Sequence, residues 1–443
     1  MKGPRPTARP GSPRETARDR NDDRRRPQGR DRALAGDRPF AGLAEPRQRR
    51  AFSTIGGPIE LGGDAREARV LGKLLAVDPG LARALTHGFH SYAGRMHPSI
   101  ARGALKTWSA SADLVVDPFC GSGTVLVEAM GLGRRAIGVD ASPLGIAIAR
   151  ARTTTLGEAG RERLRAEAAH IAEESGEHAR KRRRPESPPW AKKEFERFHA
   201  HVALELLGLR ALVMDTPEDD VGHALRLCLS SILVKVMKAG PEAPRDGAEK
   251  RIGRGIPSRL FTDRADELAR GLAALERRVP AGTPTPEIHL GDARDLGFIG
   301  DASVALVVSS PPYAGTYDYA AQHDVRFTWL ELPRRSFRDT QIGARTAGLG
   351  ADPRAWRESR RRWIGEIARV LAPGGHAMLV VGDGVVGGEA EDAPDAVAST
   401  SHPLGLEPIA RASQVRPVID NRLQPIFAAR PRREHLLLLR KTR

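Results

Sequence analysis

The sequence predicts an α/β fold built on a mostly parallel sheet, and two observations support this. The apolar run Leu114–Asp117 leads into a glycine-rich turn and then a helical pattern, Val125–Leu132, which together form a strand, turn and helix unit. Three later apolar runs also end in an acid or in a proline-rich turn, as expected at the sheet edge where open α/β sheets bind ligands.

The turn after the first strand contains Gly121 and Gly123. Because glycine lacks a Cβ, the backbone can turn tightly here and a ligand can lie against its amides. Asp117, at the end of the strand, is predicted to point into the crevice. Taken alone, the turn is equally consistent with an ordinary strand-to-helix connection.

Three further strand ends follow. Ala136–Asp140 ends in an acid about twenty residues after the turn, the offset at which nucleotide-binding units place a ribose-binding carboxylate. A third run ends at Gly291 and Asp292, and Val304–Ser309 continues into Ser310-Pro311-Pro312-Tyr313.

Together these residues resemble the S-adenosylmethionine-dependent amino-methyltransferases, most closely the DNA methyltransferases that modify the amino group of cytosine or adenine. The resemblance extends from Phe89 to roughly Arg440, apart from one insertion. It implies a Rossmann-like class I methyltransferase fold, with a mostly parallel seven-stranded sheet and a helical insertion, and S-adenosyl-L-methionine as cofactor. The implied cofactor-binding residues are Tyr92, Asp117, Phe119, Gly121, Gly123, Asp140 and Asp292.

The same resemblance implies that Ser310, Pro311, Pro312 and Tyr313 form the catalytic loop. The exocyclic amino group of a base is a poor nucleophile because its lone pair is delocalised into the ring. The fixed φ of the two prolines holds carbonyl oxygens outward, so we expect the Ser310 hydroxyl and the Pro311 carbonyl to accept the amino hydrogens. Tyr313 is expected to stack on the flipped base. No metal is required, because the cofactor carries an activated methyl group.

Phe89–Pro98 resembles the motif that closes over the methionine part of the cofactor, with Tyr92 and Arg95 as candidates. It is also interpreted as the start of a helix over Ile100–Trp108, with Pro98 in its first turn. An earlier helix is predicted over Leu71–Leu85.

After a predicted helix over Pro143–Arg152, about 130 residues precede the next strand near Ile288, far more than an α/β connection needs. An inserted helical subdomain is therefore predicted. Its helical patterns are Glu162–Glu174, Phe195–Val213, His223–Met237 and Asp263–Arg277. Its basic runs, Arg180–Arg184 and Arg245–Arg259, are either solvated surface or phosphate contacts.

The last third of the chain continues the pattern of strands and helices. A helix carries Phe327, and another, Ala355–Leu371, is predicted to end in a glycine cap within Ala372–Gly375. The remaining strands are predicted over His376–Val381, Ile409–Val415 and Glu434–Arg440. The resemblance implies that the final strand inserts antiparallel between the other two, and its leucine run agrees with burial on both faces.

Four regions are expected: a disordered basic arm at 1–50, the first half of the methyltransferase domain at 51–155, the insertion at 156–286, possibly for target recognition, and the second half at 287–443. The net charge is +16, of which residues 1–50 contribute +8. This charge suits a polyanionic partner, although a GC-rich genome produces the same bias.

Two cysteines exclude a disulfide framework, and Cys120 is interpreted as a small apolar filler beside the cofactor. No membrane-length apolar run or secretory signal is visible, so a cytoplasmic protein is expected. We expect methylation of DNA at cytosine N4. Adenine N6, tRNA guanine N2 and a non-catalytic nucleic-acid-binding protein are the alternatives. DNA is favoured over RNA as the partner, no membrane partner is expected, and a restriction-modification role leaves the partner nuclease open.

Overall fold

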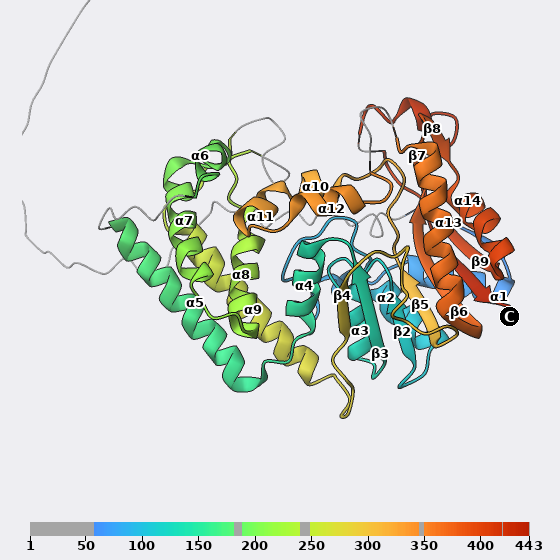
Figure 1. Ribbon diagram of the computed structural model, residues 1–443, viewed down its shortest axis with the longest axis horizontal. Helices are drawn as coiled ribbons and strands as arrows, with labels where there is room; N and C mark the ends of the chain where they lie inside the picture. Colours follow the sequence, from blue (N-terminus) through green and yellow to red (C-terminus); the bar gives the residue numbers. More distant parts are fainter. Residues whose placement is uncertain (1–56, 181–187, 240–248, 345–349, 419, 443) are drawn as a thin grey trace, which may run out of the picture. The chain divides into compact units, whose positions relative to one another are not determined.

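The computed structural model describes residues 57–180, 188–239, 249–344, 350–418 and 420–442. The predicted arm at 1–50 and most of the basic run Arg180–Arg184 lie outside these residues. An eight-stranded sheet in the order β1-β9-β10-β6-β5-β2-β3-β4 organises the fold (Figure 1). In that order the strands are Ile59–Gly63, Leu406–Val415, Arg433–Lys441, Leu371–Gly382, Val304–Ser309, Leu114–Asp117, Arg135–Asp140 and Glu287–Leu290.

The seven predicted strands are present, and β10 lies antiparallel between β6 and β9 as expected. Leu436 and Leu438 pack into the core on one face of the sheet, whereas Leu437 and Leu439 pack into the core on the other. The prediction of seven strands in the sheet is corrected to eight, because β1 extends the sheet antiparallel to β9. Its short polar sequence carries little strand signal.

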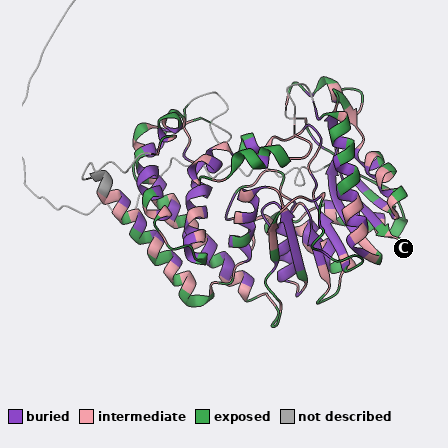
Figure 2. Ribbon diagram, in the orientation of Figure 1, coloured by how far each residue is buried: buried purple, intermediate pink, exposed green. Residues whose placement is uncertain are grey.

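Helices cover both faces of the sheet, so that most residues of the inner strands are buried (Figure 2), whereas the two edge strands β1 and β4 are exposed or half-buried. One face packs against α1, α2 and α3, and the other against α13 and α14. These helices are Ala65–Leu75, Pro98–Trp108, Thr124–Met130, Pro353–Val370 and Ala393–Ser401. The helix predicted over Leu71–Leu85 ends at Leu75 and is followed by the 3-10 turn Pro79–Arg83, because Asp78 caps a new turn there.

The glycine helix cap predicted within Ala372–Gly375 is wrong, although these four residues do bulge out of the strand pairing, since Leu371 pairs with Val304 and the next pair is His376 with Leu306. Strand β6 already begins at Leu371, and the left-handed residue Gly374, with φ +79°, lies inside this strand. The helix before it ends in an extended residue, Leu371, rather than a glycine cap. A short hairpin of β7 (Gly384–Val386) and β8 (Glu389–Glu391) was not predicted.

The insertion is helical, as expected (Figure 1). Its elements are α5 Gly157–Arg180, α6 Ala191–Glu194, η3 Phe195–Arg197, α7 Ala200–Met214, α8 Asp220–Leu233 and α9 Ile256–Glu276. Its apolar core continues into α4, Pro143–Thr153, and into three short helices after the predicted catalytic loop. Those three are α10 Tyr319–Gln322, α11 Asp324–Trp329 and α12 Arg334–Thr340. The insertion therefore shares one core with the segment that follows the loop.

Trp329 joins these two parts of the core. Its side chain is fully buried, and its indole N–H donates to the carboxylate of Glu194 at 3.1 Å. Arg210 donates to the Trp329 carbonyl at 2.8 Å, and the ring of Trp190 lies 5.2 Å from that of Trp329. Because its donor and acceptor both bind to the insertion, α11 is fixed to it.

In the described ranges, no helix combines the length and the apolar character needed to cross a membrane.

Candidate functional site

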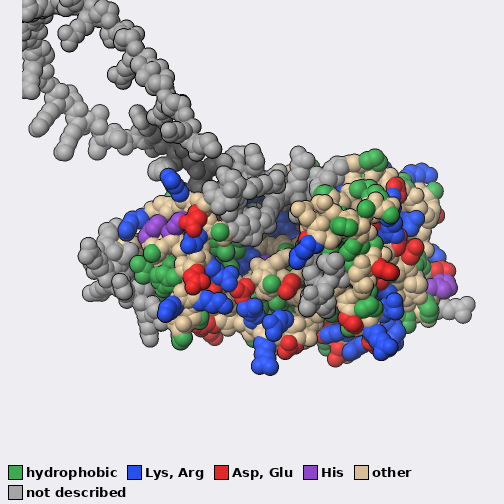
Figure 3. All heavy atoms as spheres, turned by 90° about the horizontal axis from the view of Figure 1, so that it is seen from above, with side chains coloured by type: hydrophobic (Ala, Val, Ile, Leu, Met, Phe, Trp, Pro, Cys, Tyr) green, Lys and Arg blue, Asp and Glu red, His purple; other side chains and the backbone are tan. Residues whose placement is uncertain are grey.

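A cleft of about 820 Å³, counted with its open mouth, lies at the carboxyl ends of β2, β3 and β5. Figure 3 looks onto the side where α10 and α12 lie, and shows a hollow in the middle of this face with Lys and Arg side chains near it. Residues from four parts of the chain line the cleft: 92–96, 117–125, 140–141 with 292–293, and 310–342.

The glycine turn forms the floor of this cleft. Gly121 and Gly123 adopt φ +48° and +75°, conformations that favour glycine. Gly121 lines the cleft, and a Cβ added there would stand 3.1 Å from the ring of Tyr92. Gly123 is not among the lining residues, and an added Cβ would meet Ala149 of α4 at 2.9 Å. Gly123 therefore serves close helix packing, and Gly121 allows the ring of Tyr92 to lie close against the turn.

Two aspartates lie beside the turn, and burial is the largest influence on the pKa of each carboxyl. Asp140 accepts the N–H of Gly121 at 2.8 Å and that of Ser142 at 2.7 Å, and burial raises its pKa to about 6. Asp117 accepts the hydroxyl of Ser309 at 2.6 Å, and burial raises its pKa to about 7 although this bond opposes the rise. Both carboxyls therefore titrate near neutral pH.

Asp292 and Phe119 also reach the cleft. Burial would raise the pKa of Asp292, but hydrogen bonds from Arg294 outweigh it and hold the pKa below its ordinary value. The ring of Phe119 packs edge-on against Trp363 at 5.7 Å. Asp292 thus stays ionised, and Phe119 forms an apolar part of the wall.

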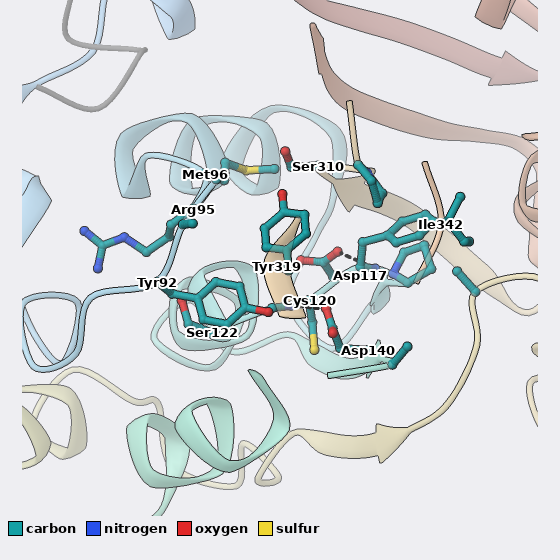
Figure 4. A pocket seen from close by; sticks show the side chains of 18 of the residues that line it. Tyr92, Arg95, Met96, Asp117, Cys120, Ser122, Asp140, Ser310, Tyr319 and Ile342 are labelled. Carbon is teal, nitrogen blue, oxygen red and sulfur yellow. Dashed lines mark hydrogen bonds between the residues drawn. The ribbon is translucent and has the colours of Figure 1, made fainter. Parts of the chain in front are cut away.

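The two candidates from the preceding loop point in different directions (Figure 4). Tyr92 reaches into the cleft, where its ring stacks 4.9 Å from that of His323. The guanidinium of Arg95 points away from the cleft and donates to the carbonyls of His87 and Ala82. The guanidinium of Arg95 therefore braces its own loop.

The predicted catalytic loop follows β5 directly. The side chains of Ser309 and Ser310 point to opposite sides, as those of successive residues in a strand do. Ser309 donates to Asp117, whereas Ser310 lines the cleft. Pro312 also lines the cleft. Pro311 is buried, and Tyr313 is not among the lining residues. The roles assigned to these residues stay predictions.

One wall of the cleft was missed by the sequence analysis. It belongs to residues 316–342, whose two ends are joined by a hydrogen bond from the Gly315 N–H to the Gly343 carbonyl at 2.9 Å. The lining residues from this segment are Tyr319, Phe337, Thr340, Gln341 and Ile342. Nothing in their spacing indicated a site, because the closure of the segment depends on two distant glycines and on the anchor at Trp329.

Arg152 connects two of the segments that line the cleft without lining it itself. It is fully buried on α4 and donates to the carbonyls of Ser122, His87 and His90 at 2.8 to 3.0 Å. It thereby ties the glycine turn to the loop that carries Tyr92. Burial holds the pKa of Arg152 well below its ordinary value.

We expect Arg152→Met to lower the free energy of unfolding by about 2 to 4 kcal/mol, because three buried carbonyls lose their donor. Urea unfolding would measure the loss. Arg150→Met is the matched control on the same helix, since Arg150 is exposed and makes one long bond, 3.3 Å, to the Ile288 carbonyl. Equal midpoints for the two variants would contradict a bracing role for Arg152.

Cys120 is buried against the turn, and burial raises the pKa of its thiol well above the ordinary value. The thiol therefore stays protonated, as a filler would. Among the described residues, no group of three or more His, Cys, Asp and Glu side chains is placed to hold a metal ion.

Residues 89–150 match the model of the N6_N4_Mtase family, described as DNA methylase. Over 63 residues the chain is 43% identical to the Type II methyltransferase M.MjaII of Methanocaldococcus jannaschii, covering 14% of this chain and 12% of that protein. Over 75 residues it is 36% identical to the Type II methyltransferase M.MvaI of Kocuria varians, covering 16% of each. The chain thus matches only a small part of the length of these relatives.

Among solved structures, TrmN from Thermus thermophilus is 12% identical with a TM-score of 0.32, covering 79% of this chain and 50% of that chain. The rRNA methyltransferase aviRa from Streptomyces viridochromogenes is 13% identical with a TM-score of 0.33, covering 79% of this chain and 88% of that one. Scores this low decide nothing about substrate.

The sheet order, with its reversed strand between β6 and β9, is that of a Rossmann-like class I methyltransferase with one added edge strand. The segment similar to a DNA methylase contains the glycine turn, Asp117 and Asp140. These residues also fit the group, since Asp117, Gly121 and Asp140 line one cleft together with the ring of Tyr92. The match to a DNA methylase family indicates S-adenosyl-L-methionine as the cofactor, and this cleft is the candidate site for it.

Proposed function

We propose that this chain is an S-adenosylmethionine-dependent methyltransferase that acts on an exocyclic amino group of a DNA base, with cytosine N4 favoured. The observation that carries the proposal is that Ser310 and Pro312 line the same cleft as the glycine turn and Asp140. The match of residues 89–150 to a DNA methylase family supports DNA as the substrate. A serine at the first position of the loop supports cytosine, because adenine enzymes of the resembling family more often have Asp or Asn there.

When bound, the cofactor supplies a methyl group on a sulfonium. Asp140 and the Gly121 turn hold its ribose and methionine parts, and Asp292 and Phe119 are proposed to contact its remaining part. The Ser310 hydroxyl and the Pro311 carbonyl accept the hydrogens of the target amino group, which draws its lone pair out of the ring. The chain therefore acts by orienting the amino nitrogen and excluding water, with no acid-base residue needed.

The experiment that tests this function is transfer of tritium from labelled S-adenosyl-L-methionine to unmethylated DNA and to tRNA, followed by nucleoside analysis. Label in N4-methylcytosine is the expected result. Label in N6-methyladenine would move the proposal to adenine, and label in N2-methylguanine of tRNA would move it to RNA. Cofactor binding without transfer to any of these would favour a non-catalytic nucleic-acid-binding protein.

A further inference from the structure

Four exposed cations lie on α6 and α12, and we call them the rim cluster. They are Lys192 and Lys193 on α6, and Arg335 and Arg338 on α12. Among the described residues, no carboxylate pairs with these side chains and no hydrogen bond holds them. Their charges are therefore available to a partner that binds at the surface.

The acids that neighbour the rim cluster are already bound by other arginines. Arg197 pairs with Asp324 and, at 3.2 Å, with Glu194 of α6. Arg210 pairs with Glu331, just before α12, at 2.8 Å. Because these carboxylates have partners within the protein, they do not neutralise the four cations beside them.

Positive charge therefore dominates this surface. On α6, η3 and α12, the exposed acids that remain are Glu196 and Asp339. The loop before α9 adds two exposed cations, Arg251 and Arg254, and His201 of α7 holds this loop through a hydrogen bond of 2.7 Å to one of its carbonyls. The cations of this surface outnumber its remaining acids.

Helix α12 places its two cations at the mouth of the cleft. Phe337, in the same turn of the helix, is buried and lines the cleft. Arg335 and Arg338 are three residues apart and share the side of the helix that faces solvent. Figure 3 looks onto this side and shows Lys and Arg side chains beside the hollow. A ligand bound by these arginines would lie along the mouth.

The two halves of the rim cluster are held in one arrangement. Trp190 directly precedes α6, and its indole N–H donates to the carboxylate of Glu331 at 3.3 Å. The ring of Trp190 also lies 5.2 Å from that of Trp329, the residue that fixes α11 to the insertion. The start of α6 thus packs against the chain that leads into α12. A surface supported in this way holds its charges in place before a ligand arrives.

A partner for such a surface is a polyanion with closely spaced charges. Duplex DNA carries one negative charge per about 1.7 Å of its axis, and Lys and Arg contact its phosphates without reading its sequence. A base reaches the cleft only if its own backbone passes the mouth, where α12 lies. The position of the rim cluster and the sign of its charge both fit this backbone.

We propose that the rim cluster binds backbone phosphates of DNA beside the target nucleotide and so positions the duplex at the cleft. This inference rests on the DNA methyltransferase function proposed above and names the surface that holds its substrate. These residues contribute affinity that depends on salt and not on sequence. They have no part in the chemical step.

Binding is measured by the fluorescence anisotropy of labelled duplexes of two unrelated sequences, over a series of salt concentrations, with S-adenosylhomocysteine present. The double variant Arg335→Gln/Arg338→Gln should bind both duplexes about tenfold more weakly at low salt. The slope of log affinity against log salt should fall in magnitude by about two, one unit for each lost phosphate contact. Lys192→Gln/Lys193→Gln should change both quantities in the same direction.

Two control variants separate phosphate binding from other effects. Arg335→Lys/Arg338→Lys keeps both charges and should retain most of the slope. Arg66→Gln/Arg69→Gln removes two exposed arginines with the same spacing from α1, a helix that contributes no residue to the lining of the cleft. This variant should keep the wild-type slope, although it loses the same net charge. Thermal melting of each variant checks the fold.

Single-turnover methylation of unmethylated DNA provides a second measurement. With saturating tritiated cofactor, Arg335→Gln/Arg338→Gln should raise the half-saturating DNA concentration about tenfold. Its plateau rate should stay within about twofold of wild type, because phosphate contacts position the duplex without touching the reacting atoms. A lower plateau at an unchanged half-saturating concentration would overturn the inference.

An unchanged salt slope in both rim variants, beside normal methylation of DNA by wild type, would overturn the inference and leave the proposed function standing. An equal loss of slope in the α1 variant would also overturn it, because any arginine would then serve. Weaker binding of tRNA by the rim variants, with DNA binding unchanged, would assign the surface to RNA instead. If wild type transfers no label to DNA, the proposed function fails, and the binding titration, which needs no transfer, still decides the inference.

Discussion

Ser310→Ala is expected to lower the single-turnover rate of methyl transfer roughly 10²- to 10³-fold, the loss typical of removing one preorganised hydrogen bond to developing charge. The Ser310 hydroxyl lines the cleft beyond the cofactor turn, so the affinity for the cofactor should stay close to that of wild type. The loss should appear in the chemical step, because the amino group needs this acceptor most as its geometry changes. Quench-flow with tritiated cofactor, beside isothermal titration with S-adenosylhomocysteine, measures both quantities.

Ser309→Ala is the matched control, since it removes the same hydroxyl one residue earlier. Ser309 is fully buried and donates to Asp117 rather than facing the cleft. Its loss should raise the pKa of Asp117 further and weaken cofactor binding, with a smaller effect on the chemical step. Methyl transfer at the wild-type rate by Ser310→Ala would remove the serine from the catalytic loop, and with it the amino-methyltransferase proposal.

The fold was largely predictable because most of its strands have a recognisable apolar pattern in their own sequence. The run Leu436–Leu439 is apolar at every position, which only a strand covered on both faces requires, and β10 is such a strand. Strand β1, in contrast, is exposed or half-buried along its length, so its sequence shows no strand pattern. It forms because β9 presents a free edge to it. A glycine does not by itself show which structure needs its left-handed conformation. Gly374 was predicted to cap a helix, but it lies in an irregular part of β6.

The site was predictable where a recognisable motif or an acid marks the end of a strand, as at Asp117, Asp140, Asp292 and Ser310. Asp117 and Gly121 belong to the same strand end and the turn that follows it, so the sequence alone places them on the same wall of the cleft. Tyr319 reaches the same wall through a closed segment whose anchor, Trp329, binds to an insertion more than a hundred residues earlier. The orientation of Tyr313 depends likewise on Glu434 at the far end of the chain. Contacts of this kind leave no periodic signal.

Asp140→Ala is expected to weaken cofactor binding about 10- to 150-fold, because charge-assisted hydrogen bonds to the ribose are worth about 1.5 to 3 kcal/mol. The carboxylate also accepts the N–H groups of Gly121 and Ser142, so the alanine variant loosens the turn as well. Asp140→Asn keeps an acceptor for one of these groups while removing the charge. Comparing the two by isothermal titration separates the support of the turn from the charge on the carboxylate.

The pH dependence gives the sharper test, because burial raises the pKa of Asp140 to about 6 from an ordinary 3.8. Below that pKa the carboxyl holds its proton, so wild-type affinity should fall as pH drops from 7 to 5, whereas Asp140→Asn should be weak and much less sensitive to pH. Stability without cofactor changes in the opposite sense. Because the folded-state pKa is raised, the stability that the protonated carboxyl allows is present below pH 3.8 and is lost as pH rises through 6. The asparagine variant has no carboxyl to ionise, so its free energy of unfolding should increase relative to that of wild type over this interval. Cofactor affinity with the same pH profile in both proteins would remove the Asp140 carboxylate from ribose binding.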